Sequence, residues 1–435
     1  MNFYRVVCVF LLTIFAPHGL LAEDSVSLKL PDTVAGKRLQ GFFDAYAAGT
    51  DDAIRSMERE HRVAGTTDIE TRVALARKFR SSWGVLTPKL ILFEQEHSLV
   101  VLAKSTGESE WYRCEVLLEA KEPYKMQGVA VTKAFGPKFH FQNMGGERLE
   151  DAVEKFRQAV DLPALAIGTI SGDHIEVAVA GVRSVNSPVP VELQDRFRLG
   201  SVSKSITGLV VAKLIDRGLL DWDAKLGELL ADINVRPEFR DVTIEQLMQN
   251  RGGVPFYPET KLFKSDAGGS AVAQRAAFAA KVLSQAPVNK PGTAYQYSNA
   301  GWSIVGHIAE RVAKRPWEEL VQVEIFDPLQ MVNAGVGWPA TVARPNQPLG
   351  HTLVDDTLSP QPIDTERYPF AVGPAGDVHC SIEDFARYAQ AHLKTLRGVD
   401  GILRPATMRR LHTPAKRTGA TDTPYAGGWL SLIHI

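Results

Sequence analysis

The feature that most constrains the fold of this chain is a serine and a lysine at the start of one apolar helix. The sequence FRLGSVSKSITG, residues 197–208, places Ser201 three positions before Lys204. Apolar residues then recur at helical spacing, at Ile206, Leu209, Val210 and Leu214. This pattern, followed by Gly218, predicts a buried helix that begins near Ser201 and runs to about Arg217.

The spacing of the two residues suits nucleophilic catalysis. Residues three positions apart share one face of a helix, and the N–H groups of the first turn are free to bind negative charge. A serine becomes a good nucleophile when a neighbouring base accepts its proton, and lysine can do so when burial or nearby positive charge lowers its pKa. Ser203 and Ser205 flank the lysine directly and lack this register. We therefore interpret Ser201 as the candidate nucleophile and Lys204 as its base.

A second motif, PGTAYQYSNAGWSIVG at residues 291–306, carries a tyrosine two positions before an asparagine. Tyr297 supplies a phenol suited to proton transfer, and Asn299 supplies an amide that can hold a substrate and the lysine. Tyr295 competes for the first role, but the residue two positions after it is a tyrosine. Because a loop tyrosine usually serves packing, this interpretation depends on the serine–lysine pair.

Residues 147–430 resemble the serine β-lactamase and penicillin-binding protein superfamily, and its class C β-lactamase-like branch in particular. The resemblance is carried by FRLGSVSKSITG, LIDRGLLDWDAKL, TIEQLMQNRGGVP, PGTAYQYSNAGW, IFDPLQM and PAGDVHCSIEDFARY, which occur in the family's order. It implies an α/β (α+β) serine β-lactamase-like domain over residues 147–429. Such a domain has an antiparallel sheet flanked by helices and an all-helical subdomain.

The same resemblance implies roles for four side chains. Ser201 would be the acylated nucleophile and Lys204 its base, while the Ser201 N–H would supply half of the oxyanion hole. Tyr297 would relay a proton to the leaving group. Asn299 would bind the substrate and orient the lysine. No metal and no organic cofactor is implied.

The chain departs from the family pattern in two places. Residues 249–253, QNRGG, stand where many relatives carry H-x-S-G-L, and we expect this loop to be structural. The third family motif is K-[ST]-G or H-x-G, on a strand beside the cleft, and it comes after the segment that YAGGW represents here. KRTG at 416–419 resembles this motif but precedes YAGGW. We therefore expect the true motif to lie beyond the end of the chain.

The last six residues, LSLIHI at 430–435, follow YAGGW without a polar tail. We interpret them as a non-native tail, translated from library adapter sequence, on a domain that is truncated at its C-terminus. The alternative is a short strand, WLSLIHI. On the first interpretation the chain lacks part of its sheet and half of its oxyanion hole. We then predict that it is inactive and poorly folded.

Residues 1–22 have the pattern of a secretory signal peptide. MNFYR carries a positive charge, VVCVFLLTIFA is apolar but short for a bilayer span, and Ala22 precedes two acids. We expect cleavage after Ala22 and a periplasmic or secreted protein with no other membrane contact. The alternative is an uncleaved N-terminal anchor.

Residues 23–135 predict a small α+β domain, followed by a linker over 136–146. Thr33 can cap a helix that Gly49 closes, and further helical stretches follow at about 51–60 and 68–82. Four strand-like runs come next: KLILFE, SLVVLAK, WYRCEVLLEA and MQGVAVT. Helices followed by such a meander are similar to cystatin-like folds, in which a curved sheet wraps around a helix. After the linker, ALAIGTI and IEVAVAG flank SGD and predict a tight β-hairpin.

Composition narrows the classes of partner and chemistry. The 435 residues include 49 Lys and Arg against 50 Asp and Glu, and a net charge of −1 argues against binding nucleic acid or an anionic membrane. We expect Cys114 and Cys380 to be free, buried thiols. The sequence contains neither H-E-x-x-H nor a Cys/His cluster. A Ser-His-Asp hydrolase would need His351 or His379 as base, but no G-x-S-x-G elbow is present.

The sequence therefore predicts a serine hydrolase that acts through an acyl-enzyme on Ser201. Its substrates would be small molecules or peptides, with esters and D-peptides first and β-lactams second. The alternative is a non-catalytic or slowly turning-over penicillin-binding sensor or scaffold.

Overall fold

The computed structural model describes residues 28–62, 68–95, 98–106, 111–118, 123–134, 148–159, 162–256, 268–354, 357–363, 369–415 and 425–430. These fall into two compact units, residues 28–134 and residues 148–415 with 425–430. The segments interpreted as signal peptide (1–22), linker (136–146) and KRTG (416–419) lie outside the described residues, as does 431–435 of the tail.

The first unit begins with three helices: α1 (Val34–Ala48), α2 (Asp51–His61) and α3 (Ile69–Trp83). The hydroxyl of Thr33 accepts a hydrogen bond from the Gly36 N–H and caps α1. Gly49 ends α1 with φ of 70°, a left-handed conformation that glycine adopts at no steric cost. The predicted cap and stop of this helix are therefore confirmed. Thr50 and Asp68 cap α2 and α3 in the same way.

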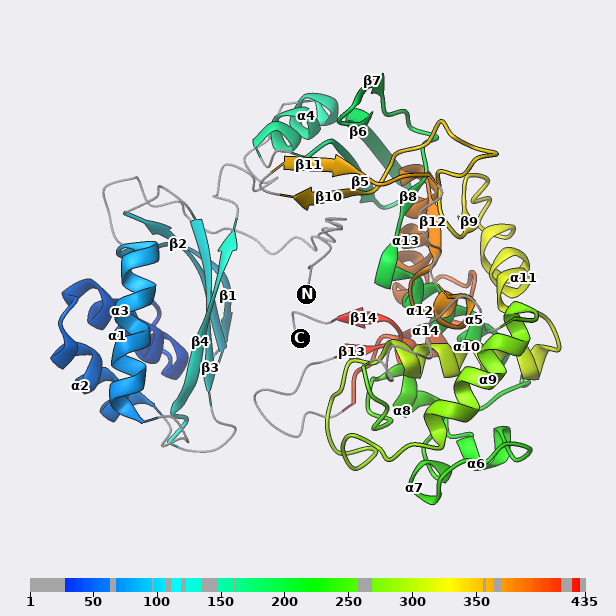
Figure 1. Ribbon diagram of the computed structural model, residues 1–435, viewed down its shortest axis with the longest axis horizontal. Helices are drawn as coiled ribbons and strands as arrows, with labels where there is room; N and C mark the ends of the chain where they lie inside the picture. Colours follow the sequence, from blue (N-terminus) through cyan, green and yellow to red (C-terminus); the bar gives the residue numbers. More distant parts are fainter. Residues whose placement is uncertain are drawn as a thin grey trace. The chain divides into compact units, whose positions relative to one another are not determined.

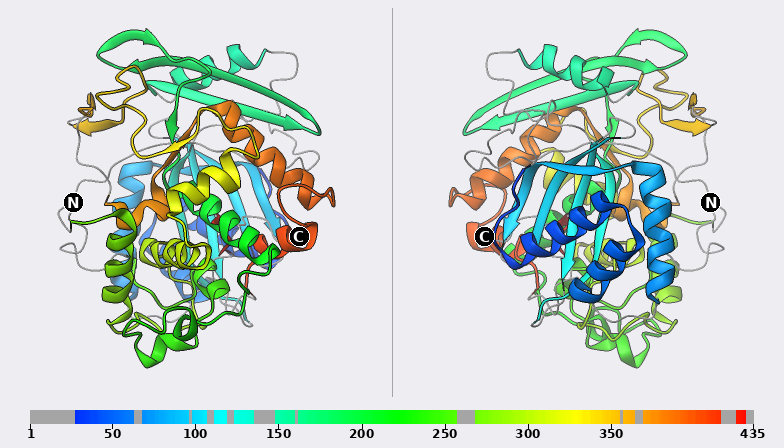
Figure 2. Two further views of the ribbon diagram at one scale, coloured as in Figure 1. Left: turned by 90° about the vertical axis from the view of Figure 1, so that its right-hand side faces the viewer. Right: turned by 90° about the vertical axis from the view of Figure 1, so that its left-hand side faces the viewer.

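Four antiparallel strands follow in sequence order: β1 (Leu86–Gln95), β2 (Ser98–Ser105), β3 (Trp111–Leu118) and β4 (Met126–Ala134). α1 packs across all four strands, and the right-hand view of Figure 2 shows the helices on one face of the sheet. The core between them includes Leu39 and Phe43 of α1 and Val101, Cys114 and Met126 of the strands. The predicted order of helices and meander is confirmed. The similarity to cystatin-like folds stays a prediction.

The second unit opens with α4 (Leu149–Ala159) and the antiparallel strands β5 (Ala164–Ser171), β6 (His174–Ser184) and β7 (Ser187–Pro190). The register of β5 and β6 runs from Ala164↔Gly181 to Ser171↔His174, with Gly172 at φ 61° in the turn. The predicted hairpin is confirmed. Both α4 and α13 (Ile382–Leu396) pack against it.

The centre of the second unit is α5 (Ser203–Asp216), which is buried from Ser203 to Ala212 and again at Leu214. A helix with this pattern must be surrounded by other elements. α10 (Asn299–Ala313), α11 (Trp317–Val321), α12 (Gly373–Gly376) and α14 (Pro405–Leu411) all contact it. The helical region is completed by α6 (Leu226–Leu229), α7 (Pro237–Arg240), α8 (Ile244–Met248), α9 (Ala271–Leu283) and the π-helical segment η6 (Gln322–Phe326) (Figure 1).

Short antiparallel strands connect this region to the hairpin. β8 (Phe197–Arg198), β12 (Val378–Cys380) and β9 (Gly335–Val336) form one sheet in that order. β10 (His351–Val354) pairs with β11 (Thr357–Pro360), and β13 (Tyr425–Ala426) pairs with β14 (Trp429–Leu430). Antiparallel strands flanked by helices, with an all-helical region, confirm the predicted fold class.

A smaller expectation can also be compared with the structure. Cys114 and Cys380 are free and buried, as predicted. Among the helices that the structure describes, none combines the length and the apolar character that a membrane crossing requires.

Candidate active site

Ser201 is held at the surface where a strand meets a helix. β8 pairs with β12 through Arg198↔His379, which anchors the chain just before the turn. Gly200 takes φ of 54°, in the region that favours glycine. Ser201 follows in the short 3₁₀ turn η3 (Gly200–Val202), so the predicted helix starts with a tighter turn before α5. Ser201 is exposed, whereas the residues of α5 that follow it are buried.

Lys204 is fully buried and points at this serine. Its Nζ lies 3.1 Å from Ser201 Oγ and donates a hydrogen bond of 2.6 Å to the carbonyl of Ala375 in α12. Nζ also lies 4.9 Å from the centre of the Tyr297 ring. Burial disfavours the charged ammonium and lowers the pKa of Lys204 to about 7. A large share of the molecules therefore carry a neutral amine near neutral pH.

Tyr297 reaches the same oxygen from the loop before α10. Its hydroxyl donates a hydrogen bond of 2.8 Å to Ser201 Oγ. Asn250 holds this loop in place, because its Oδ1 accepts the Ser298 N–H at 3.2 Å and its carbonyl accepts the Gln296 N–H at 2.7 Å. Asn250 has φ of 56°, a conformation that asparagine tolerates better than most residues.

The role of Asn250 was not visible in the sequence, although its loop was expected to be structural. The departure QNRGG at 249–253 thus supplies the polar group that orients the tyrosine loop. The available signal was an asparagine and two glycines within the five residues QNRGG, a composition typical of turns with left-handed residues.

Asn299 is the first residue of α10 and is mostly buried, with 7% of its surface exposed. Its N–H donates to the carbonyl of Phe256 at 3.2 Å, and its carbonyl accepts the hydroxyl of Ser303 at 3.1 Å. Phe256 is exposed, and its ring centre lies 5.7 Å from that of Tyr297. The structure thus brings Ser201, Lys204 and Tyr297 into direct contact. The hydrogen bonds described for Asn299 are with Phe256 and Ser303.

The other two serines of the motif have structural partners. Ser203 Oγ donates to the carbonyl of Gly200 at 2.7 Å and accepts the Val378 N–H at 3.0 Å. Ser205 Oγ donates to the carbonyl of Val202 at 2.8 Å and accepts the Tyr388 hydroxyl at 2.9 Å. Both are buried, so Ser201 is the serine of the motif that solvent reaches.

The two histidines of the alternative hydrolase mechanism also have structural roles. Nδ1 of His379 lies 2.9 Å from the carbonyl of Gly337, and burial lowers the pKa of this side chain to about 4. Nε2 of His351 accepts the Val185 N–H at 3.1 Å, and burial lowers the pKa of His351 as well. Neither is among the groups that contact Ser201 Oγ in the described structure, where the contacts come from Lys204 and Tyr297.

The β13–β14 hairpin packs directly onto α5 through its glycines. A Cβ on Gly428, whose φ is 93°, would lie 2.2 Å from the Ser205 nitrogen. A Cβ on Gly208 of α5 would lie 2.7 Å from the Gly427 carbonyl oxygen. Next to these glycines, Tyr425 lies 6.2 Å from Tyr297 between ring centres. The glycines of YAGGW are therefore required by close backbone approach.

Comparisons with known proteins show which family the chain belongs to. The family model described as Beta-lactamase matches residues 149–432. The chain is 27% identical over 253 residues to penicillin-binding protein 4 of Amycolatopsis lactamdurans, which covers 56% of this chain and 63% of that protein. It is 25% identical over 238 residues to a beta-lactamase of Escherichia coli K12, which covers 54% of this chain and 58% of that protein. The chain thus spans less than two thirds of the length of either relative.

A solved structure supports the fold. The penicillin binding protein from Bacillus halodurans superposes with a TM-score of 0.52 at 21% identity, over 63% of this chain and 82% of that one. The match to the family model extends over more than half of the chain and includes every residue of the site described above. The chain belongs to the Beta-lactamase family.

Proposed function

We propose that this protein is a serine hydrolase that forms an acyl-enzyme on Ser201. One observation carries the proposal: the exposed Ser201 Oγ lies 3.1 Å from the buried Lys204 Nζ and accepts a hydrogen bond of 2.8 Å from the Tyr297 hydroxyl. A hydroxyl between an amine of lowered pKa and a phenol is well arranged to lose its proton and attack a carbonyl.

In the acylation step, neutral Lys204 takes the proton of Ser201, and the serine oxygen bonds to the carbonyl carbon of the substrate. The carbonyl electron pair moves to its oxygen, and the Ser201 N–H at the helix start would stabilise that oxyanion. The tetrahedral intermediate then expels the leaving group, which takes the proton from Lys204 by way of Tyr297. Water hydrolyses the acyl-enzyme with the same groups acting in reverse.

Asn299 would complete the site as a substrate-binding residue. Its amide can both donate and accept, so it can hold a substrate amide and the lysine together. Its position at the start of α10, two residues after Tyr297, supports this role. Asn250 would keep Tyr297 and Asn299 in position through its hydrogen bonds to the N–H groups of Gln296 and Ser298.

The substrate must carry a carbonyl that a serine can attack. Esters, D-peptides and β-lactams meet this condition, and the curated relatives are named for penicillin binding and β-lactam hydrolysis. We place esters and D-peptides first and β-lactams second, because β-lactam hydrolysis does not require the additional α+β unit. The proposed roles of the site residues are the same for all three substrate classes.

Covalent labelling tests the nucleophile. The full-length protein, expressed from its complete gene, would be treated with a fluorophosphonate and with a fluorescent penicillin, beside Ser201→Ala and Ser284→Ala. Ser284 is a suitable control because it is an exposed serine whose hydroxyl bonds to the carbonyl of Lys281, three residues away. We expect label in the wild type and in Ser284→Ala and none in Ser201→Ala. Label that Ser201→Ala retains would refute the proposal, and label on Ser201 without release would identify a sensor.

We also propose that the protein is exported to the periplasm or secreted, on the strength of the N-terminal sequence alone. Sequencing of the N-terminus of the protein recovered from cells tests this. A mature chain that begins at Glu23 is expected. A chain that retains residues 1–22 would favour the N-terminal anchor.

A further inference from the structure

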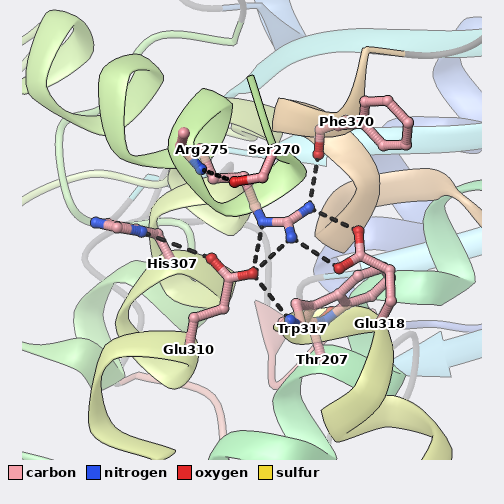
Figure 3. A network of polar contacts seen from close by, with 9 residues as sticks. Thr207, Ser270, Arg275, His307, Glu310, Trp317, Glu318 and Phe370 are labelled. Atoms are coloured by element: carbon pink, nitrogen blue, oxygen red, sulfur yellow. Dashed lines mark hydrogen bonds and ion pairs between the residues drawn. The ribbon is translucent and has the colours of Figure 1, made fainter. Parts of the chain in front are cut away.

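The second unit contains a buried ion cluster where α9, α10 and α11 meet. Arg275 of α9 is fully buried, and its guanidinium donates hydrogen bonds to the carboxylates of Glu310 and Glu318 (Figure 3). We call these three side chains the Arg275 cluster. Glu310 is 3% exposed, so two of the three charges are withdrawn from water. Desolvation offsets much of the attraction within such a cluster, which makes net stability a weak account of it.

The cluster bonds directly to the segment that contacts the candidate base. Nη1 of Arg275 donates a hydrogen bond of 2.9 Å to the carbonyl of Phe370. Phe370 opens the short helix η7 (Phe370–Val372), which continues without a break into α12. Within α12, the Ala375 carbonyl accepts the 2.6 Å hydrogen bond from Lys204 Nζ. Residues 370–376 therefore connect the guanidinium to the lysine.

A second route joins the cluster to the same segment. Glu310 accepts the Trp317 N–H at 2.8 Å, and the Trp317 indole N–H donates to Thr207 Oγ1 at 3.1 Å (Figure 3). Thr207 lies three residues after Lys204 on α5, and its hydroxyl donates to the Pro374 carbonyl at 2.8 Å. Residues 370–376 therefore accept hydrogen bonds at two places, from Arg275 at the Phe370 carbonyl and from Thr207 at the Pro374 carbonyl.

Packing leaves this segment little freedom to shift. A Cβ on Gly306 of α10 would lie 2.3 Å from Cγ of Pro374, so the helix backbone and the proline are in direct contact. A Cβ on Gly373 would lie 3.4 Å from the Trp317 ring and 3.8 Å from Nη1 of Arg275. Bonds and packing together fix the carbonyl that faces the lysine.

We propose that the Arg275 cluster is a positioning element for Lys204. It fixes residues 370–376 so that the Ala375 carbonyl holds the lysine amine beside Ser201 and water stays out. The cluster touches neither substrate nor the reacting atoms, so its members are positioning residues. The inference rests on the proposed function for one point, the use of Lys204 as a base.

The test uses two variants and a matched control in the full-length protein. Arg275→Lys keeps the charge, but a lysine ammonium lacks the planar fork that bonds two carboxylates and a carbonyl at once. Glu318→Gln removes one charge at a side chain that is 30% exposed, which makes it the milder change. Arg183→Lys is the control, because Arg183 makes a two-pronged bond to the buried Asp195 and bonds to no residue of the 370–376 segment in the described structure.

Two measurements are made on each protein. NMR of lysine-labelled samples follows the titration of the Lys204 amine directly, and fluorophosphonate labelling follows acylation against pH. Both midpoints should lie near 7 in the wild type and in Arg183→Lys. In Arg275→Lys and Glu318→Gln, water reaches the amine and both midpoints should rise by about one pH unit. Labelling at pH 7 should then fall several-fold and recover by about pH 9.

The outcomes separate the two proposals. Folded variants whose NMR midpoint equals that of the wild type would overturn the positioning role, even if both melt at lower temperature. If Arg275→Lys does not fold, Glu318→Gln decides the question alone. If the NMR midpoint moves while the wild type cannot be labelled on Ser201, the positioning role stands and the proposed function fails.

Discussion

The buried state of Lys204 predicts how acylation of Ser201 depends on pH. Burial lowers the pKa of this lysine from 10.5 to about 7. At pH 7 about half of the molecules then carry the neutral amine, compared with about one in 3,000 for a solvated lysine. Burial therefore raises the population of the competent base about a thousandfold. The rate should increase with pH, because the base is the deprotonated form.

Single-turnover labelling with a fluorophosphonate between pH 5 and pH 9 measures this dependence. We expect a plateau above about pH 8, a midpoint near 7 and about a tenfold loss for each pH unit below 6. Lys204→Arg should abolish labelling at every pH, since a guanidinium stays protonated. Lys213→Met is the matched control on the same helix, because Lys213 pairs with Glu324 and not with the serine.

Three results would refute the reasoning. A rate that does not change between pH 5 and pH 9 would mean that Lys204 does not act as the base. A midpoint above about 9 would mean that the amine is solvated and that the burial of Lys204 does not tune it. Wild-type labelling of Lys204→Arg would exclude the lysine mechanism altogether.

Three further predictions concern stability and the geometry of the site. Lys204→Met should stabilise the second unit by about 2 kcal/mol at pH 7. Burying the lysine as a neutral amine costs about 4 kcal/mol of folding free energy at this pH, and the hydrogen bonds lost with it offset about half of that gain. The unfolded chain binds more protons at this lysine between pH 7 and 10.5, so wild-type stability rises with pH. In urea unfolding the advantage of Lys204→Met should vanish near about pH 9 and reverse towards pH 10.5, where the cost of burying the lysine is gone and the lost hydrogen bonds remain. Asn250→Gly keeps the left-handed backbone but removes the acceptor of the Ser298 N–H, so labelling should slow about tenfold with the lysine midpoint unchanged; an unchanged rate would exclude the loop from the site. Gly428→Ala sets a Cβ 2.2 Å from a backbone nitrogen of α5 and should lower the melting temperature far more than Gly218→Ala, where φ is also positive (70°) and no atom lies within 4 Å; equal losses would show that strain alone matters.

The sequence alone was sufficient for the local elements of the site. The apolar stripe from Ile206 to Leu214 and the glycine at 218 predicted the buried helix α5, because helical periodicity depends only on neighbours in the chain. The cap at Thr33 is local for the same reason. The family resemblance supplied the pairing of this helix with the tyrosine loop. Periodicity cannot show such a pairing.

Only the tertiary structure determined what surrounds the lysine. The Ala375 carbonyl is 171 residues from Lys204 in the chain, and the Asn250 amide is 48 residues from the loop that it holds. Backbone carbonyls have no sequence signature. The sequence also does not show whether an asparagine or an arginine in a helical region faces water or a buried partner. The charge of Arg275 could be read from the sequence. The guanidinium is buried between Glu310 and Glu318 only when α9, α10 and α11 pack together. The same packing brings it to the Phe370 carbonyl, at the start of the segment beside the lysine. The sequence thus determined which residues are candidates for reaction, and packing determined how deeply they are buried and which groups they contact.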